Sequence, residues 1–472
     1  MDTKKLRQKI LDLAIRGKLV PQDPNDEPAS VLLERIRAEK EQLIKEGKIK
    51  RSKKSASTDK SHYENVPFEI PESWCWVEMS DIFLLNPKNE IGDDVDSGFI
   101  PMANANDGFS GKHTFIVKKW GNIKKGFSHF RDGDIGVAKI SPCFENLKSV
   151  IFSNLPNQVG AGTTELVVLR GILVNSAFYL YLVKSGWYIS EGTKYFKGVV
   201  GQQRVHRDIF TSLQVPMPPL NEQQLIVDTI RTCFKVIDRI EDDKIELESH
   251  IKQVKSKILD LAISGKLVPQ DPSDEPAIEL LKRINPNFVP CDNSHYENLP
   301  FEIPESWCWC NGEQIFLPMI SCKPTDEFFK YIDIESIDNK NHKLLEPKVL
   351  KSINAPSRAS RYTKKGDVLF SMVRPYLKNI ALVDEDNFIA STGFYICSPS
   401  KLLISNYCYY MMLSNYVVNG LNQFMKGDNS PSINNSHITS WLYPIPPLEE
   451  QRRIVDRIES LYKYLNTITA EL

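Results

Sequence analysis

Residues 221–266 read NEQQLIVDTIRTCFKVIDRIEDDKIELESHIKQVKSKILDLAISGK, and this stretch decides the fold. Steps of alternately four and three residues along it meet an apolar side chain at ten of eleven positions. These positions are Ile226, Ile230, Cys233, Ile237, Ile240, Lys244, Leu247, Ile251, Val254, Ile258 and Leu261. Apolar residues that recur every three and a half positions are typical of the contact seam of a coiled coil.

The residues at the two ends of this stretch fit one continuous helix. Pro218 and Pro219 stop any preceding element, Asn221 with Gln224 can cap the amino end, and Gly265 can supply the left-handed residue that ends the helix. A helix of this extent is about 66 Å long at about 1.5 Å per residue. Because its other faces are charged, we expect a partner helix along the apolar seam.

The two ends of the chain supply that partner by repetition. Residues 444–458, PIPPLEEQRRIVDRI, match residues 216–230, PMPPLNEQQLIVDTI, and residues 9–29 match residues 257–277 at all but two positions. The seam continues in both terminal segments, at Ile454, Ile458, Leu461, Leu465, Ile468, Leu6, Ile10 and Leu13.

Joined end to end, the terminal segments would rebuild the central helix without residues 245–248, which is about one helical turn. The sequence therefore predicts a circularly closed, pseudo-two-fold repeat of two units. Two long antiparallel helices would form its coiled coil, and the chain termini would lie close together.

A second repeated block introduces two dissimilar interiors. SHYENVPFEIPESWCW at residues 61–76 recurs at residues 294–309 with one difference, whereas residues 77–213 and 311–442 share little sequence. Identical flanks around unlike interiors indicate a duplicated scaffold that carries two different surfaces.

Local patterns inside these interiors predict an α+β fold. Residues 134–140 and 367–373 read as short apolar strands that follow a glycine, and residues 176–185 and 406–418 read as helices. We expect each interior to be a twisted, mostly antiparallel sheet with helices. A further helix is expected at about residues 29–47.

The predicted domain boundaries follow from these blocks. The five segments are residues 1–20 (part of the second long helix), 21–213 (first variable domain), 214–267 (central helix), 268–441 (second variable domain) and 442–472 (the rest of the second helix).

Composition excludes several classes of protein. The formal net charge is −1, so any contact with nucleic acid must come from local patches. The nine cysteines include no Cys-x-x-Cys pair, which argues against a metal site or a disulfide framework. No uninterrupted apolar run is long enough to span a membrane, and an amphipathic helix follows Met1 in place of a signal peptide, so a cytoplasmic location is expected.

No residue is predicted to be catalytic or to bind a metal. Gly160 and Gly162 lack the third glycine of a dinucleotide cradle, and no phosphate-binding loop motif occurs. Residues 285–288, NPNF, lack the second proline of the related adenine methyltransferase element. His62 and His295 occupy equivalent places in the repeat, which a structural hydrogen bond explains better than catalysis.

Two basic windows indicate contact with DNA. Residues 112–131 and 345–364 lie at nearly the same place in the two units and are rich in lysine and arginine. Such cations can neutralise phosphates, and Arg, Asn and Gln side chains can read base edges. The loops before the two long helices add further polar residues. The candidate DNA-binding residues are Lys112, Lys118, Lys119, Lys124, Lys125, Arg131, Gln202, Gln203, Arg204, Lys348, Lys351, Arg358, Arg361, Lys364, Lys426 and Asn429.

Three motifs in combination resemble a known family. The Pro-Pro-Leu-x-Glu-Gln motif at residues 218–223 and 446–451, the LDLAIxGKLVPQDP block and the duplicated variable domains are similar to the specificity subunit of type I DNA restriction-modification systems. The resemblance covers the whole chain.

This resemblance implies a non-catalytic subunit with two target-recognition domains, each of which reads half of an asymmetric, interrupted DNA sequence. The paired helices would set the spacing of the half-sites and dock two modification (methyltransferase) subunits, and restriction endonuclease/translocase subunits would complete the enzyme. The chain itself would hold no cofactor, since S-adenosylmethionine, ATP and Mg²⁺ would bind to these partners.

Two other functions remain open from the sequence. A pseudo-dimeric coiled-coil scaffold for protein partners would share the seam without reading DNA, and salt-dependent DNA retention distinguishes it. A stand-alone methyltransferase would need a cofactor motif that the sequence lacks, and S-adenosylmethionine binding to the isolated chain would test it.

Overall fold

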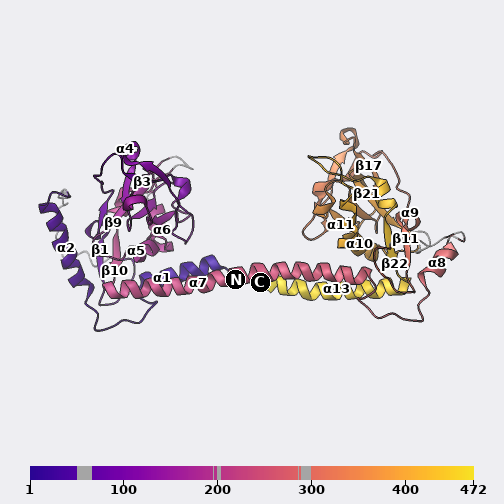
Figure 1. Cartoon of the computed structure of the whole chain (residues 1–472), viewed down its shortest axis with the longest axis horizontal. Helices are drawn as coiled ribbons and strands as arrows, with labels where there is room; N and C mark the ends of the chain where they lie inside the picture. The colour runs from indigo at the N-terminus through magenta and orange to yellow at the C-terminus, as the bar shows by residue number, and fades with distance from the viewer. Residues whose placement is uncertain are drawn as a thin grey trace. The chain divides into compact units, whose positions relative to one another are not determined.

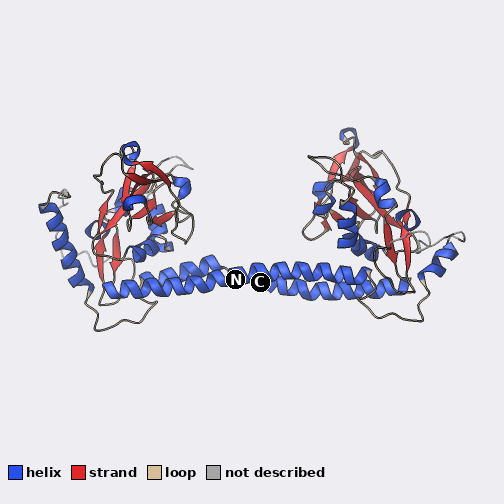
Figure 2. Cartoon of the chain, viewed as in Figure 1, coloured by secondary structure: helices blue, strands red, loops and turns tan. Residues whose placement is uncertain are grey.

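The computed structural model describes residues 1–49, 66–194, 196–198, 203–284, 286, 288 and 299–471. His62, His295 and Gln202 fall outside these residues. The chain divides into two compact units, Met1–Asp243 (unit 1) and Lys244–Leu472 (unit 2), and each combines helices with sheets (Figures 1 and 2). The predicted α+β class with two repeated domains is confirmed.

The described residues of unit 1 form three sheets. A two-stranded ladder pairs the strand that enters the domain with the strand that leaves it. One four-stranded sheet packs against helices and is called here the helix-side sheet, and the other is called the outer sheet. The ladder consists of β1 (Cys75–Glu78) and β10 (Gln214–Met217). The helix-side sheet has the spatial order β2 (Phe83–Leu85), β9 (Leu166–Gly171), β6 (Ile135–Ala138) and β7 (Ser149–Ile151). The outer sheet has the spatial order β4 (Ile116–Lys119), β3 (Asp96–Ile100), β8 (Val159–Gly162) and β5 (Ser128–Arg131).

Unit 2 repeats this strand order. Its ladder consists of β11 (Cys308–Asn311) and β22 (Leu442–Ile445). Its helix-side sheet has the order β12 (Phe316–Leu317), β21 (Phe394–Pro399), β18 (Val368–Ser371) and β19 (Ile380–Leu382). Its outer sheet has the order β16 (Lys348–Lys351), β13 (Phe328–Ile332), β20 (Phe388–Ser391) and β17 (Ala359–Thr363). A small hairpin, β14 (Ile337–Asp338) with β15 (Lys343–Leu344), is added. Among the strands described, all pairs are antiparallel except β3 with β8 and β13 with β20, so the mostly antiparallel prediction holds.

The apolar core of each unit lies in layers. On β6, Ile135 and Val137 face the helices whereas Ala138 faces the outer sheet, because successive strand residues point to opposite faces. Gly160 and Gly162 lie on β8, where a Cβ atom would come within 2.4 Å and 2.3 Å of backbone oxygens of β3. These glycines therefore serve close strand packing.

The helices of the two variable domains are short, except α2, which has 17 residues. The predicted helix at 29–47 is found as α2, and the one predicted at 406–418 is divided at Ser414. The bounds are α2 (Ala29–Lys45), α3 (Met79–Ile82), α4 (Trp120–Ile123), α5 (Ser176–Val183), α6 (Gly186–Thr193), α8 (Ala277–Ile284), α9 (Gly312–Ile315), α10 (Ser405–Leu413), α11 (Asn415–Asn422) and α12 (Asn435–Thr439). The 3-10 turns are η2 (Met102–Asn104), η3 (Pro156–Gln158), η4 (Arg207–Phe210), η5 (Ile334–Ser336), η6 (Ser352–Asn354) and η7 (Pro375–Leu377). None of the described helices is both long and apolar enough to cross a membrane.

The predicted long helix is α7 (Leu220–Ile263), which has 44 residues and belongs to both units. In unit 1, α1 (Thr3–Ile15) runs antiparallel to it, since the Arg7 guanidinium bonds Asp238 and Glu241, each at 2.8 Å, while Gln22 reaches back to Glu222. In unit 2, α13 (Leu448–Glu471) runs antiparallel to the second half of α7, because Tyr462 donates to the Lys255 carbonyl at 3.0 Å whereas Gln270 reaches Glu450.

Burial along the predicted seam is uneven. Buried seam residues are Ile10, Ile226, Ile230, Ile237, Ile251, Ile258, Ile454 and Ile458, and half-buried ones are Leu13, Cys233, Leu261, Leu461 and Leu465. Exposed ones are Leu6 (37%), Ile240 (40%), Leu247 (38%), Val254 (46%) and Ile468 (43%). A strict three-and-a-half-residue repeat drifts on a helix of 3.6 residues per turn, and residues outside the predicted seam are buried as well. Examples are Leu11, Ala262 and Phe234, whose ring packs on Phe109 and Tyr181.

The near-identical sequence blocks meet in one joint in each unit. In unit 1 the Trp74 indole donates to the Glu222 carboxylate at 2.8 Å, and Gln22 donates to the same carboxylate at 2.5 Å. In unit 2, Trp307 and Gln270 bond Glu450 at 2.9 Å and 2.6 Å. Burial raises the pKa of both carboxyl groups. The Pro-Pro-Leu-x-Glu-Gln, VPQDP and FEIPESW segments are thus repeated together because they pack on one another.

The domain ends lie beyond the predicted boundaries. β10 pairs with β1, and β22 pairs with β11, although residues 214–217 and 442–445 were expected to belong to the helical segments. Pro218 and Pro446 follow these strands, so the proline that stops each strand also marks the start of each long helix.

We expect Trp74→Phe to destabilise unit 1 by about 1–3 kcal/mol, because the change leaves a buried Glu222 oxygen without its indole donor. Thermal unfolding should show a melting temperature several degrees lower, at about 2–4 °C per kcal/mol. The exposed Tyr464 offers a control, since Tyr464→Phe should leave the melting temperature unchanged. An unchanged melting temperature in Trp74→Phe would show that the joint is not held by this bond.

Candidate nucleic-acid interface

The two basic windows lie at the same place in the two units, namely the edges of the outer sheet. Residues 112–131 cover β4, α4 and β5, and residues 345–364 cover β16, η6 and β17. β4 and β16 form one edge of their sheets, and β5 and β17 form the other. The two windows, which lie at nearly the same place in the two sequence repeats, therefore occupy the same position in the fold.

In unit 1 some of the cations in the basic window form ion pairs with nearby acids. Lys112, Lys118, Lys125 and Arg131 are exposed, and the Lys118 ammonium lies 4.2 Å from the centre of the Phe99 ring. Lys119 instead pairs with Asp96 at 2.9 Å, and Lys124 pairs with Asp93 at 2.6 Å. The acids come from β3 and the segment before it, so a window without acids in sequence has acids beside it in space.

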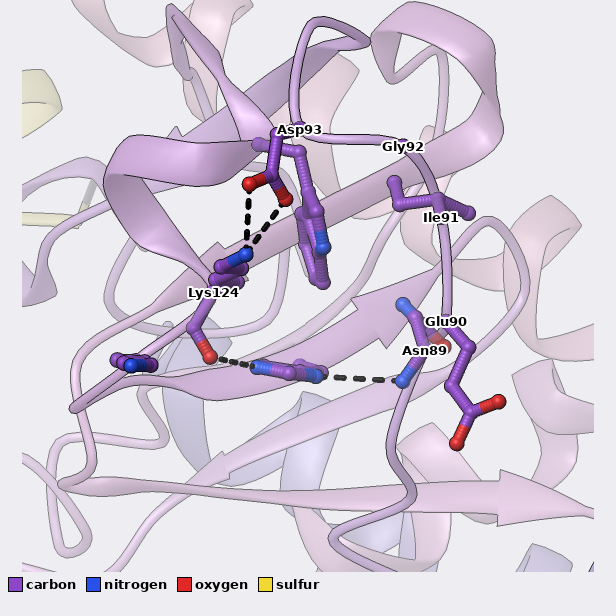
Figure 3. A pocket seen from close by; sticks show the side chains of 9 residues that line it. Asn89, Glu90, Ile91, Gly92, Asp93 and Lys124 are labelled. Carbon is purple, nitrogen blue, oxygen red and sulfur yellow. Dashed lines mark hydrogen bonds and ion pairs between the residues drawn. The ribbon is translucent and has the colours of Figure 1, made fainter.

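An open hollow of about 620 Å³ lies beside α4 (Figure 3). It is lined by Asn89, Glu90, Ile91, Gly92, Asp93, Trp120, Lys124, Lys125 and His129. The His129 ring bonds the Lys124 carbonyl at 2.8 Å and accepts from the Asn89 amide at 3.2 Å. Burial lowers the pKa of His129. This histidine therefore holds the wall of the hollow as a neutral ring with both nitrogens occupied.

Unit 2 shows a similar division. Lys348 pairs with Asp333 at 2.6 Å and Glu335 at 3.3 Å. The Lys351 ammonium lies 5.5 Å from the centre of the Phe328 ring, and Arg358 and Lys364 are exposed. Arg361 is half-buried. The exposed cations of unit 2 thus come from both edges of its outer sheet.

The loops before the long helices carry the other candidates. Arg204 makes a two-pronged contact with Glu165, with its closest approach at 2.9 Å, and the hydrogen bond from Arg204 lowers the pKa of that carboxyl. Gln203 accepts from the Ser141 amide through its carbonyl at 2.8 Å. In unit 2, Lys426 is exposed, and the exposed Asn429 accepts from Arg374 through its carbonyl at 2.6 Å.

Sequence reasoning missed the loops that support these candidates. The β6–β7 loop (139–148) bridges through Ile140 to Arg204, in the segment that begins at residue 203, and the β18–β19 loop (372–379) bridges to 426–432 through Val373 and Ser432. The available signal was position, because both loops follow the strands predicted at residues 134–140 and 367–373. In each unit, the loop and the chain segment to which it is bridged are called the interlocked loop pair.

The exposed residues suit contact with a polyanion. Among the described residues no group of three or more His, Cys, Asp or Glu side chains could hold a metal ion. Exposed ammonium and guanidinium groups along a sheet edge can neutralise phosphates, and the amide side chains of the loops can form paired hydrogen bonds with base edges.

Known proteins resemble the chain over nearly its whole length. The family model for the type I restriction modification DNA specificity domain matches residues 71–249 and 321–472. The specificity subunit of the type I restriction enzyme EcoAI from Escherichia coli is 33% identical over 98% of this chain and 90% of its own. The EcoEI specificity subunit, also from Escherichia coli, is 33% identical over 99% of this chain and 90% of its own.

Two solved structures share the fold. The HsdS subunit from Thermoanaerobacter tengcongensis has a TM-score of 0.55 at 16% identity, over 86% of this chain and 93% of that chain. A chain from a structure described as the structural basis of complex assembly and conformational transition of the type I R-M system has a TM-score of 0.56 at 18% identity, over 86% of this chain and 94% of its own.

Proposed function

Because the chain belongs to the family of type I restriction modification DNA specificity domains, we propose that it is the sequence-reading subunit of a type I restriction-modification complex. Each unit would read one half of an interrupted DNA target. The observation that carries the proposal is the repeated placement of exposed cations on the edges of both outer sheets, although the interiors share little sequence.

The division of labour within each unit follows from side-chain chemistry. Exposed Lys118, Lys125 and Arg131 in unit 1, with Arg358 and Lys364 in unit 2, would contact phosphates and fix the position of the duplex. The interlocked loops would present polar groups to base edges. Since the two loop pairs differ in sequence, the two half-sites would differ, and the target would be asymmetric.

Catalysis would reside in the partners. The chain would dock two modification subunits through its paired helices and adjoining surfaces, and endonuclease/translocase subunits would join them. S-adenosylmethionine, ATP and Mg²⁺ would bind to those subunits, and any base flipping needed for methylation would occur in the partner's pocket. This chain would supply sequence choice alone and would not be an enzyme by itself.

We expect the triple change Lys118→Ala, Lys125→Ala and Arg131→Ala to weaken DNA binding by the assembled complex and to flatten its salt dependence. Each lost phosphate contact removes about 0.9 from the slope of log affinity against log salt, so the slope should fall by about 2–3. Binding is measured by fluorescence anisotropy across a salt series.

The matched control removes three exposed cations that lie outside both the outer sheet and the paired helices, by Lys18→Ala, Arg37→Ala and Lys45→Ala. It makes the same change in net charge and should leave the slope unchanged. If both triple variants behave alike, or if the complex retains DNA without salt dependence, the chain is a protein scaffold and the proposal is wrong.

A further inference from the structure

A buried lysine in unit 1 ties the β6–β7 loop to the helices. Lys184 caps the carboxyl end of α5 and is 0% exposed. Its ammonium donates to the Leu147 carbonyl at 2.6 Å and to the Gly108 carbonyl at 2.5 Å. Leu147 lies near the end of the β6–β7 loop, and Gly108 lies in the β3–β4 loop, so one side chain holds two loops to one helix end.

Unit 2 makes the corresponding contact from the opposite side. Lys378, in the β18–β19 loop, directs its ammonium to the Leu413 carbonyl at the end of α10 and to the Asn415 side chain, each at 3.2 Å. The Lys378 carbonyl is bonded in turn to the His342 ring, at 3.1 Å, from the β13–β16 connection. The same three segments are therefore joined in both units.

The loop positions of the two contacts are equivalent. Leu147 and Lys378 each stand two residues before the next strand and have positive φ angles of 58° and 51°. The carbonyl of each accepts a hydrogen bond at 2.8 Å from the amide two residues later. A side chain at this loop position is apolar in unit 1 and cationic in unit 2.

The helix positions are equivalent as well. Ser185 and Ser414 each cap the following helix and donate to a carbonyl three residues earlier at 2.7 Å. Lys184 and Leu413 precede these serines directly. A lysine and a leucine have thus exchanged places between the two units, while the contact between loop and helix end has been kept.

The contacts of Lys184 and Lys378 hold the interlocked loop pairs, which would face DNA. The β6–β7 loop bonds the segment bearing Gln203 and Arg204 through the Ser141 amide and the Lys139 carbonyl, each at 2.8 Å. In unit 2, the Arg374 amide bonds the Pro431 carbonyl at 2.8 Å, and its guanidinium bonds Asn429. A shift of either loop would therefore move the polar groups of its neighbour.

Stability alone does not explain a buried cation at this place. Burial lowers the pKa of Lys184 to about 7, and it also lowers the pKa of Lys378. An apolar pair at both positions would avoid the cost of removing an ammonium from water. The directional bonds of an ammonium to carbonyls, in contrast, fix where a loop lies.

We propose that Lys184 and Lys378 are positioning residues for DNA sequence reading, each fixing the interlocked loop pair of its own unit. The inference rests on the proposed function. Neither lysine touches DNA, and each acts through the carbonyl groups of the segments that it joins.

The test exchanges the lysine and leucine of unit 1 in the full chain, assembled with its modification subunits. Lys184→Leu alone should lower discrimination against single-base variants of one half-site by about tenfold, the equivalent of one lost base contact, and should leave the other half-site unchanged. Lys184→Leu with Leu147→Lys recreates the arrangement of unit 2 and should restore discrimination. Methylation rates on oligonucleotide duplexes measure both.

Hydrogen exchange supplies a second readout. Amides of residues 139–148 should exchange faster in Lys184→Leu and return to the wild-type rate in the exchanged pair. The reciprocal variants, Lys378→Leu with and without Leu413→Lys, repeat the test at a half-buried site if Lys184→Leu does not fold. Unchanged discrimination in both single variants, or no rescue by either exchange, overturns the inference.

Failure of the proposed function looks different. A wild-type complex that shows no sequence discrimination refutes DNA reading itself, whereas a discriminating wild type with unaffected variants refutes only the role of the two lysines.

Discussion

Replacing residues 79–213 of unit 1 with the interior of another member of the family changes one half of the DNA sequence that is methylated and leaves the other half unchanged. This is the expected result because β1 and β10 close the interior off. Their antiparallel ladder brings entry and exit together, and the Met79 amide bonds the Leu213 carbonyl at 3.1 Å just beyond it. An interior exchanged inside this ladder keeps the repeated joint intact.

The packing of unit 1 supports independent exchange. The layer between its two sheets, which includes Ile100, Phe130 and Phe152, is built entirely from residues within the exchanged segment. The helix-side layer contacts retained residues, among them Ile226 and Ile230 of α7. We therefore expect the exchanged interior to fold and its loops to keep their own base preference.

Genome-wide methylation sequencing in a host that carries the modified complex measures the outcome. The reciprocal exchange of residues 312–441, between β11 and β22, serves as the matched control and should change the other half-site alone. Alteration of both half-sites by one exchange, or of neither, would refute independent reading by the two units.

The arrangement of two repeated domains and a long helix could be predicted from the sequence, because the sequence repeats and one long segment has a regular apolar pattern. The 44 residues of α7 give many turns over which an apolar pattern stands out, and the Pro-Pro pairs mark where it begins. Its register was less predictable, since a rotation of one residue separates Val254, which is exposed, from Lys255, which contacts Tyr462. Small angular drift along a helix decides such contacts.

The site was predictable in position and not in detail. The basic windows could be found locally, but the acids that neutralise Lys124 and Arg204 are 31 and 39 residues away in sequence. The contact between Lys184 and Leu147 also joins residues 37 positions apart. Pairings of this kind depend on strand order and loop conformation, which local patterns do not specify.

Inserting a second copy of residues 245–248 into α7 should lengthen the unspecified gap between the two half-sites by about two base pairs. Four residues add about 6 Å to a helix, and the duplex rises about 3.4 Å per base pair. α7 belongs to both units, so its length would reach the DNA as a change in spacing. Deleting residues 245–248 should shorten the gap by a similar amount.

The chosen segment suits the experiment because it is the part of the central helix that the joined chain ends do not repeat. Ile245 is 67% exposed, so added residues meet little steric resistance there. Insertion also turns the helix by about 40° beyond a full turn, while two base pairs turn the duplex by about 70°. The rotation of the helix and the rotation of the duplex differ by only about 30°, so the longer target should still be bound.

Replacing residues 245–248 with four alanines is the control, since it changes composition without changing length and should leave the gap as it is. Methylation sequencing reads the gap directly in all three variants. If insertion and deletion both leave the wild-type spacing in place, the helix does not act as a ruler, and the spacing must be set by contacts between the complex and the DNA between the half-sites.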